Sequence, residues 1–252
     1  TPYSSAKLGS LYPGPRIKEG GDWSPLTRAS LGTVPVEVDG SAHFVVPAGK
    51  PLCFQALDAD GLAITSMRSG THFLPGERAT CQGCHEPKHT APPLRGEPVR
   101  VAMRRGPSRI QQAVNEGAPI SFPRLVQPVL DKQCVACHAR NGGKAPGLER
   151  SLVMNKHGIT LGARFSASYV NLLPYAVYGY GDAKRTIPGQ FGARVSKLYE
   201  LVSKGHHDVK LSADEMRRLT LWLDSMSVFY GVYDAEGQQA ELRGEYAKPP
   251  LE

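Results

Sequence analysis

Apolar residues alternate with other residues over 34–38, which is the period of a half-buried β-strand. Asp39-Gly40 follows directly, and this pair is a strong signal for a tight hairpin turn into a second strand that continues over 44–46. Turn residues then separate two further apolar segments, 52–57 and 62–67. The pattern predicts a meander of about four antiparallel strands.

The apolar period becomes helical in the second half of the chain. Apolar residues recur at intervals of three and four over 195–202, and Gly205 is placed to end that helix. Ser212 and Glu215 have the spacing of a capping box, which predicts that another amphipathic helix begins there. A further helix should start near Pro128, because proline is tolerated in the first turn.

Two motifs in the chain have two cysteines followed at once by a histidine. Two thiols at this spacing can both reach one edge of a porphyrin, while the histidine turns its imidazole onto the iron. The pattern is the attachment signature of c-type haem and predicts two covalently attached haem c groups. The motifs consist of Cys81, Cys84 and His85, and of Cys134, Cys137 and His138.

Two rival interpretations fit the motifs less well. A thioredoxin-like redox pair needs no histidine after the second cysteine. A zinc ribbon usually separates its two cysteine pairs by roughly 15–20 residues, and the gap between 84 and 134 is far longer.

These patterns together predict an α+β chain. An extended arm or linker, 1–31, is rich in proline and glycine and precedes a β-rich domain, 32–107, which is a small meander or sandwich-like unit carrying the first haem. A mainly helical domain resembling small cytochromes c, 108–235, carries the second haem. The remainder, 236–252, is predicted to be a surface tail.

The axial ligands decide whether each iron is closed or open to small molecules. His138 is the proximal ligand expected for the second haem, and His206, in the loop between two predicted helices, is the best distal candidate. A methionine at helical spacing more often belongs to the core than to a metal site. The competitors of His206 are His207, His157, Met154 and Met226.

The first haem leaves its ligands open. His85 is the default proximal ligand, and His89, four residues later, is its main rival. His72 and His43 are distal candidates, although His43 lies in a predicted strand and could equally be a packed or surface residue.

Cys53 is left over once the two motifs are assigned. A free cysteine is among the most buried residue types, so a small buried hydrophobic residue in a strand is the first expectation. The alternatives are a metal ligand and an intermolecular disulfide, because an odd thiol in an oxidising compartment is exposed to both.

Composition and charge agree with a redox protein outside the cytoplasm. The formal net charge is +7, but Lys and Arg are spread along the chain, with Arg104-Arg105 and Arg217-Arg218 as the longest runs. This favours docking to an acidic redox partner over nucleic-acid binding. No apolar run approaches the length of a membrane span, and no charged and apolar leader is present at Thr1. Covalent haem attachment implies a periplasmic or otherwise extracytoplasmic location.

Several segments resemble the middle and C-terminal haem-bearing regions of the hydrazine synthase alpha subunit family, over nearly all of 32–235. In that family a β-propeller usually precedes this region, and no propeller repeat occurs here, so the chain is expected to be a fragment, a reduced relative or part of something longer. The resemblance rests on 34–52, 55–58, 67–69, 75–77, 126–131, 188–194, Gly205-His206, Trp222 and 229–231, together with both motifs.

The resemblance also implies one difference at the first haem. In the family a tyrosine four residues after the motif histidine binds iron and leaves that histidine to zinc, whereas this chain has His89 at that position. The tyrosinate site therefore does not carry over, and ordinary nitrogen ligation is expected.

Three functions follow from these features. The first is electron transfer through two haems between redox partners, within a larger redox complex. The second is catalysis at the first haem, resembling hydrazine synthase or a peroxidase. The third is a structural subunit of a redox assembly.

Overall fold

The computed structural model of the chain describes residues 28–67, 70–81, 99–112, 114–141, 143–154, 164–176, 188–232 and 234–247. The α-helices are α2 Phe122–Leu125, α3 Gln127–Gln133, α4 Val135–Arg140, α5 Ala167–Leu172, α6 Lys197–Ser203, α7 Ala213–Asp224 and α8 Ala235–Leu242. The strands are β1 Gln55–Leu57, β2 Ala63–Ser66, β3 Leu152–Met154 and β4 Arg164–Ser166, and short 3-10 helices span η2 Val101–Arg104, η4 Leu173–Tyr175 and η5 Gly192–Val195.

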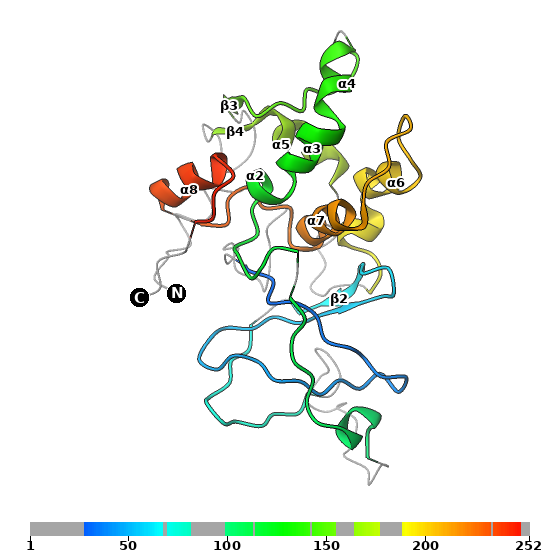
Figure 1. Cartoon of the computed structure of the whole chain (residues 1–252), viewed down its shortest axis with the longest axis vertical. Coiled ribbons are helices and arrows are strands. Elements are labelled where there is room, and N and C mark those ends of the chain that lie inside the picture. The colour runs from blue at the N-terminus through cyan, green and yellow to red at the C-terminus, as the bar shows by residue number, and fades with distance from the viewer. Residues whose placement is uncertain are drawn as a thin grey trace.

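Over the described residues the fold is mixed, with two small antiparallel sheets and several helices. Figure 1 shows the helices α2 to α8 together in the upper part of the molecule, whereas the described segments before α2 lie mostly below them and contain little regular structure. The predicted α+β class is thus confirmed at the level of its elements.

The hairpin predicted from 52–57 and 62–67 forms as β1 and β2, which pair antiparallel with Gln55 opposite Ser66. Its turn is closed by Asp58, whose backbone N–H donates to the carbonyl of Leu62 at 3.0 Å and whose Oδ1 accepts from the Leu62 N–H at 2.9 Å. An aspartate whose carboxylate accepts backbone N–H groups within its own turn favours a turn at that position, as the sequence predicted.

The predicted hairpin over 34–46 forms only its turn, with the Glu37 N–H donating to the Ser41 carbonyl at 2.8 Å. Its flanks do not pair with each other as strands. Thr33 instead forms a β-bridge with Gln111, and Phe44 forms one with Ser108. The prediction of a four-stranded meander was therefore wrong within the described residues. The backbone groups that would have paired within a local hairpin pair instead with residues much later in the chain.

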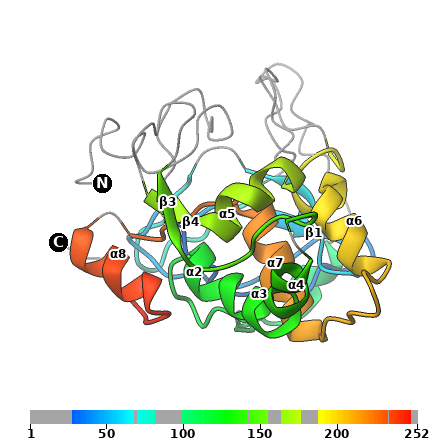
Figure 2. The same ribbon diagram turned by 90° about the horizontal axis from the view of Figure 1, so that it is seen from above.

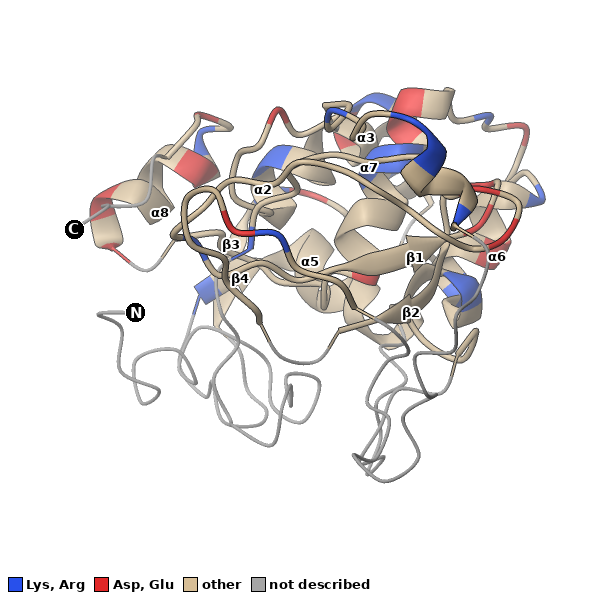
Figure 3. Cartoon of the chain, turned by 90° about the horizontal axis from the view of Figure 1, so that it is seen from below, with Lys and Arg blue, Asp and Glu red and all other residues tan. Residues whose placement is uncertain are grey.

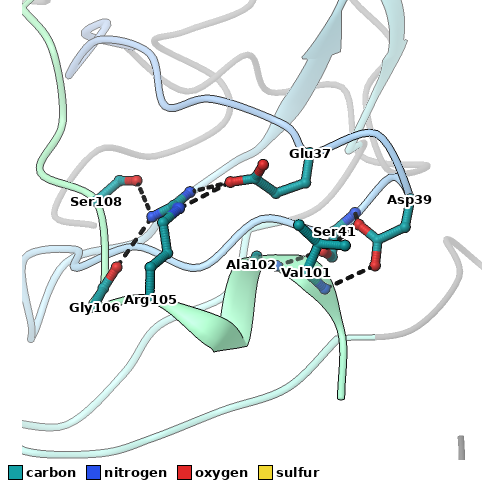
Figure 4. A network of polar contacts seen from close by, with 8 residues as sticks. All are labelled: Glu37, Asp39, Ser41, Val101, Ala102, Arg105, Gly106 and Ser108. Atoms are coloured by element: carbon teal, nitrogen blue, oxygen red, sulfur yellow. Dashed lines mark hydrogen bonds and ion pairs between the residues drawn. The ribbon is translucent and has the colours of Figure 1, made fainter. Parts of the chain in front are cut away.

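Side chains hold this turn to the segment around η2 (Figure 4). Arg105 donates to Glu37 Oε1 from Nε at 2.8 Å and from Nη2 at 2.6 Å. Asp39 accepts from the Ser41 hydroxyl at 2.6 Å and from the Val101 N–H at 3.0 Å, and these bonds lower its pKa to about 2. The polar residues of the expected hairpin thus contact residues 101 and 105, which lie more than 60 positions later in the chain.

The core lies between the helices and is built on aromatic side chains. Phe122 of α2 packs edge-on against Tyr169 of α5 and Trp222 of α7, with ring centres 5.2 Å apart in both cases. The ring centre of Phe229 lies 4.8 Å from that of Tyr169, and the ring centre of Phe165 in β4 lies 5.1 Å from that of Phe229. All five are buried, so this cluster ties α2, α5, α7 and β4 into one unit.

The β1–β2 hairpin joins the same core, although the sequence analysis assigned it to the other domain. Ala63 is fully buried, and its N–H donates to Asp224 Oδ2 at 3.0 Å. Asp224 Oδ1 accepts from the Ala193 N–H at 2.7 Å. The carboxylate at the end of α7 therefore fastens β2 and η5 to the helices.

Asp224 predicts a pH dependence of stability. Burial raises its pKa from 3.8 to about 6, although its two backbone bonds act in the opposite direction. Between these values the folded chain binds a proton that the unfolded chain releases, so the contribution of Asp224 to the free energy of unfolding falls as pH rises, by up to about 1.4 kcal/mol per pH unit. Urea unfolding across this range should show a steeper fall of stability with pH in the natural chain than in Asp224→Asn, which keeps the slope that Glu241 contributes through its own raised pKa. Equal slopes in the two chains would contradict the prediction.

The predicted helices around 195–226 are confirmed. Gly205 adopts φ +83° just after α6, and Ser212 caps α7 in a complete capping box with Glu215. Pro128 lies in the first turn of α3.

The predicted surface tail at 236–252 differs from the structure over its first residues. These form most of α8, whose Glu241 is buried and accepts the Gly231 N–H at 2.9 Å. Burial raises the pKa of Glu241 to about 7. The sequence of α8 has no periodic apolar signal, because the helix contacts the core through the Glu241 carboxylate and the single apolar side chain of Leu242.

Candidate functional site

The second cysteine motif lies at the junction of α3 and α4. Cys134 directly follows α3 and is half-buried, whereas Cys137 and His138 lie within α4. Both cysteines are free thiols. Burial is the largest cause that raises the pKa of the Cys134 thiol, followed by the charge of Glu215.

The imidazole of His138 has one nitrogen already engaged. Its Nδ1 lies 2.8 Å from the carbonyl oxygen of Pro146, so Nδ1–H donates and Nε2 keeps a free lone pair. Histidines that bind metals almost always hold their second nitrogen in this way, because the bond fixes both tautomer and ring orientation. The structure thus prepares His138 as a ligand.

His206 is the partner that the structure brings to His138. Their ring centres are 6.3 Å apart, and the ring planes are inclined by 51°. An iron ion about 2 Å from one nitrogen of each ring would place the two ring centres roughly 6 Å apart. The pair therefore fits two-imidazole axial ligation of a haem attached at Cys134 and Cys137.

The backbone around His206 forms a tight turn between α6 and α7. Gly205, His207 and Asp208 all have positive φ, and the Val209 N–H donates to the His206 carbonyl at 3.1 Å. The His207 ring lies 4.4 Å from that of His206, in an edge-on arrangement. The turn thus presents His206 to the motif, with His207 behind it.

Electrostatics at this pair favour the form that binds metal. Burial, and then the neighbouring His207 and His138, lower the pKa of His206. The neutral imidazole is the ligating form. Among the described residues no group of three or more His, Cys, Asp or Glu side chains is arranged to hold a metal ion.

The other predicted ligands fall into two groups. Cys84, His85, His89 and His157 lie outside the described residues, and Cys81, at the edge of the described chain, is exposed. Of the competitors, Met154 is exposed in β3 and Met226 is buried in the aromatic core, so neither is brought to His138.

The distal candidates of the first haem are both described. His72 is exposed, and His43 is half-buried. The His43 Nδ1 is buried without a hydrogen-bond partner among the described residues. His43 therefore retains a nitrogen that could still take a ligand.

Cys53 is exposed, so the prediction of a buried small residue was wrong. Its thiol donates to the carbonyl of Met67, the residue directly after β2, at 3.2 Å. The residue precedes β1 on an edge that no further strand of the described chain covers, which a strand pattern alone could not reveal.

Sequence reasoning missed two residues of the site. Pro146 contributes its carbonyl to His138, and a backbone acceptor carries no sequence signal. Glu215 was recognised only as a helix cap, but it also contacts Lys132 and Gln133 of α3. A contact between helices so far apart in sequence has no local pattern.

These features define a mixed α/β chain whose helical part places two imidazoles beside the second Cys-X-X-Cys-His motif. In the comparison with known families, residues 15–86 match the family described as the hydrazine synthase alpha subunit middle domain. The matched range includes the first cysteine motif. No curated protein matches the chain.

The fold agrees with this relationship. The solved structure of Kuenenia stuttgartiensis hydrazine synthase superposes with a TM-score of 0.59 at 18% sequence identity, over 90% of this chain and 37% of that chain. The chain thus spans little more than a third of the solved relative. No helix of the described residues is long and apolar enough to cross a membrane.

Proposed function

We propose that the chain is a dihaem c-type cytochrome that transfers electrons between redox partners outside the cytoplasm, as part of a larger redox complex. One observation carries the proposal: the ring centres of His138 and His206 lie 6.3 Å apart, which is about the separation that an iron ion bound between them requires. Closed ligation by two imidazoles suits electron transfer, because it leaves no vacant position for a substrate.

Each residue of the site has a distinct role in this proposal. Cys134 and Cys137 form the thioether attachments, and His138 is the proximal ligand that Pro146 orients. His206 would supply the second imidazole ligand. The haem supplies one-electron chemistry when bound, and the protein sets its potential through ligands, burial and nearby charge.

The first haem is proposed for Cys81 and Cys84, with His85 or His89 as proximal ligand and the segment 32–107 around it. We assign it to electron relay, since this chain lacks a tyrosine four residues after His85.

Partners are proposed from charge and from the family relationship. Figure 3 shows Lys and Arg on several elements, including the region of α3 and α7, with Asp and Glu on the same face. The net charge of +7 suits an acidic redox partner, whose approach such a surface would accelerate. The relationship to hydrazine synthase supports work within an assembly.

Mass and spectrum test this proposal directly. The chain, produced with the covalent haem-attachment machinery of a bacterial periplasm, should carry the mass of the polypeptide plus two haems after denaturation. The ferric second haem should be low-spin and should not bind carbon monoxide when reduced. One haem, or none that survives acid extraction, would contradict the assignment, and Cys134→Ala with Cys137→Ala should remove one haem only.

Catalysis at the first haem is the second candidate, because the family match covers the first motif. A high-spin first haem that binds hydroxylamine, nitric oxide or peroxide and turns it over would replace electron transfer as the function.

A further inference from the structure

The carboxylate of Glu215 lies at the contact between α3 and α7, which are side by side in Figures 1 and 2. The residue is only 7% exposed. Its Oε1 accepts from Lys132 Nζ at 2.8 Å and from Gln133 Nε2 at 3.0 Å, and its Oε2 accepts from the Ser212 N–H at 2.8 Å. The bond from Lys132, followed by the other donors, lowers the pKa of Glu215 to about 2, so the group is ionised at neutral pH.

These donors come from the two segments that form the candidate iron site. Gln133 immediately precedes Cys134, the first thiol of the motif. Ser212 ends the loop that begins with Gly205 and His206. A capping box needs only the bond to Ser212, and the two bonds from α3 are additional. Glu215 therefore links the attachment segment to the loop of the distal histidine.

The charge of Glu215 also acts at the attachment position. It is the second-largest cause that raises the pKa of the Cys134 thiol, after burial. A fixed negative charge beside an iron centre stabilises the more positive ferric form over the ferrous form. Its effect is greater when the group is withdrawn from water.

We propose that Glu215 is a positioning residue of the second haem, which holds the His206 loop in register with His138 and lowers the reduction potential. This inference rests on the haem site proposed above. It assigns Glu215 a role beyond helix capping.

The test is Glu215→Gln in the haem-loaded chain, followed by a spectroelectrochemical titration. The midpoint potential of the second haem should shift upward, and part of the ferric second haem should become high-spin, because the charge and the bonds from α3 are weakened. Asp214→Asn is the matched control. It removes one negative charge from the same first turn of α7, but Asp214 is exposed and pairs with Arg218 at 2.7 Å. It should leave both readouts unchanged.

Lys132→Met gives a second, independent test with the opposite sign. The Lys132 side chain is 70% exposed, so its replacement should be tolerated by the fold. Without its ammonium group the charge of Glu215 is less compensated, and the midpoint potential should shift downward. This variant decides the inference if Glu215→Gln fails to fold.

The outcomes separate this inference from the haem site itself. His206→Ala identifies which of the two redox components belongs to the second haem. If that variant opens the iron while neither Glu215→Gln nor Lys132→Met shifts the potential, the haem site stands and the role of Glu215 is overturned. A loss of thermal stability alone would likewise reduce Glu215 to a helix cap. If His206→Ala leaves the iron closed, the proposed function fails first.

Discussion

Replacing His206 with alanine should open the second haem to carbon monoxide. In the reduced protein this haem should then bind one carbon monoxide molecule, whereas in the natural chain it should bind none. His206 is the only side chain among the described residues whose ring is placed 6.3 Å from that of His138. Removing it leaves the iron five-coordinate, because His138 remains held by the Pro146 carbonyl. Optical titration of the dithionite-reduced protein with carbon monoxide measures the change.

His207→Ala is the matched control for this experiment. His207 is adjacent in sequence and contacts the His206 ring, so its removal disturbs the same loop without removing the ligand. The second haem of this variant should stay closed and low-spin. If only His207→Ala admits carbon monoxide, the ligand assignment is wrong by one position.

Replacing Gly192 with alanine should destabilise the chain by about 3 kcal/mol or more, through left-handed strain and overpacking. Gly192 has φ +63°, and an added Cβ would lie 2.1 Å from Asp224 Oδ1 and 3.2 Å from the Asp224 Cα. The carboxylate would have to leave the amides of Ala193 and Ala63, which would then be buried without an acceptor. Urea unfolding followed by tryptophan fluorescence reports the loss, since Trp222 lies in this core.

Gly244→Ala separates backbone strain from the collision. Gly244 has φ +81° beside α8, and nothing lies within 4 Å of the position that its Cβ would take. The Gly244→Ala variant should therefore lose only the free energy that a left-handed backbone costs an alanine, about 1–2 kcal/mol. Equal losses in the two variants would show that the contact with Asp224 contributes nothing.

Local features were predictable from the sequence because their partners lie within a few residues. Ser212 and Glu215 satisfy each other's backbone groups across one helical turn, and Gly205 ends α6 through its own backbone freedom. Asp58 closes the β1–β2 turn in the same local manner. Each cysteine motif likewise consists of five consecutive residues, 81–85 and 134–138.

Long-range contacts could not be predicted, and they account for the errors. The alternation over 34–38 satisfied the rule for a strand, but Val38 is fully exposed. The backbone near it pairs with residues 108–111, which no local pattern connects to it. Cys53 was expected to be buried because of its residue type, whereas its exposure depends on which strands cover the sheet edge.

The candidate site also combines local features, which the sequence predicts, with long-range contacts, which it does not. The sequence by itself determined the two cysteines and the histidine of the second motif and the loop in which His206 lies, since each depends on spacing or on the ends of single helices. Only the tertiary structure decided that His206 rather than Met226 meets His138, and that Glu215 joins α3 to α7. Burial, orientation and charge at a site depend on segments that the fold brings together, and these properties arise only when the helices pack.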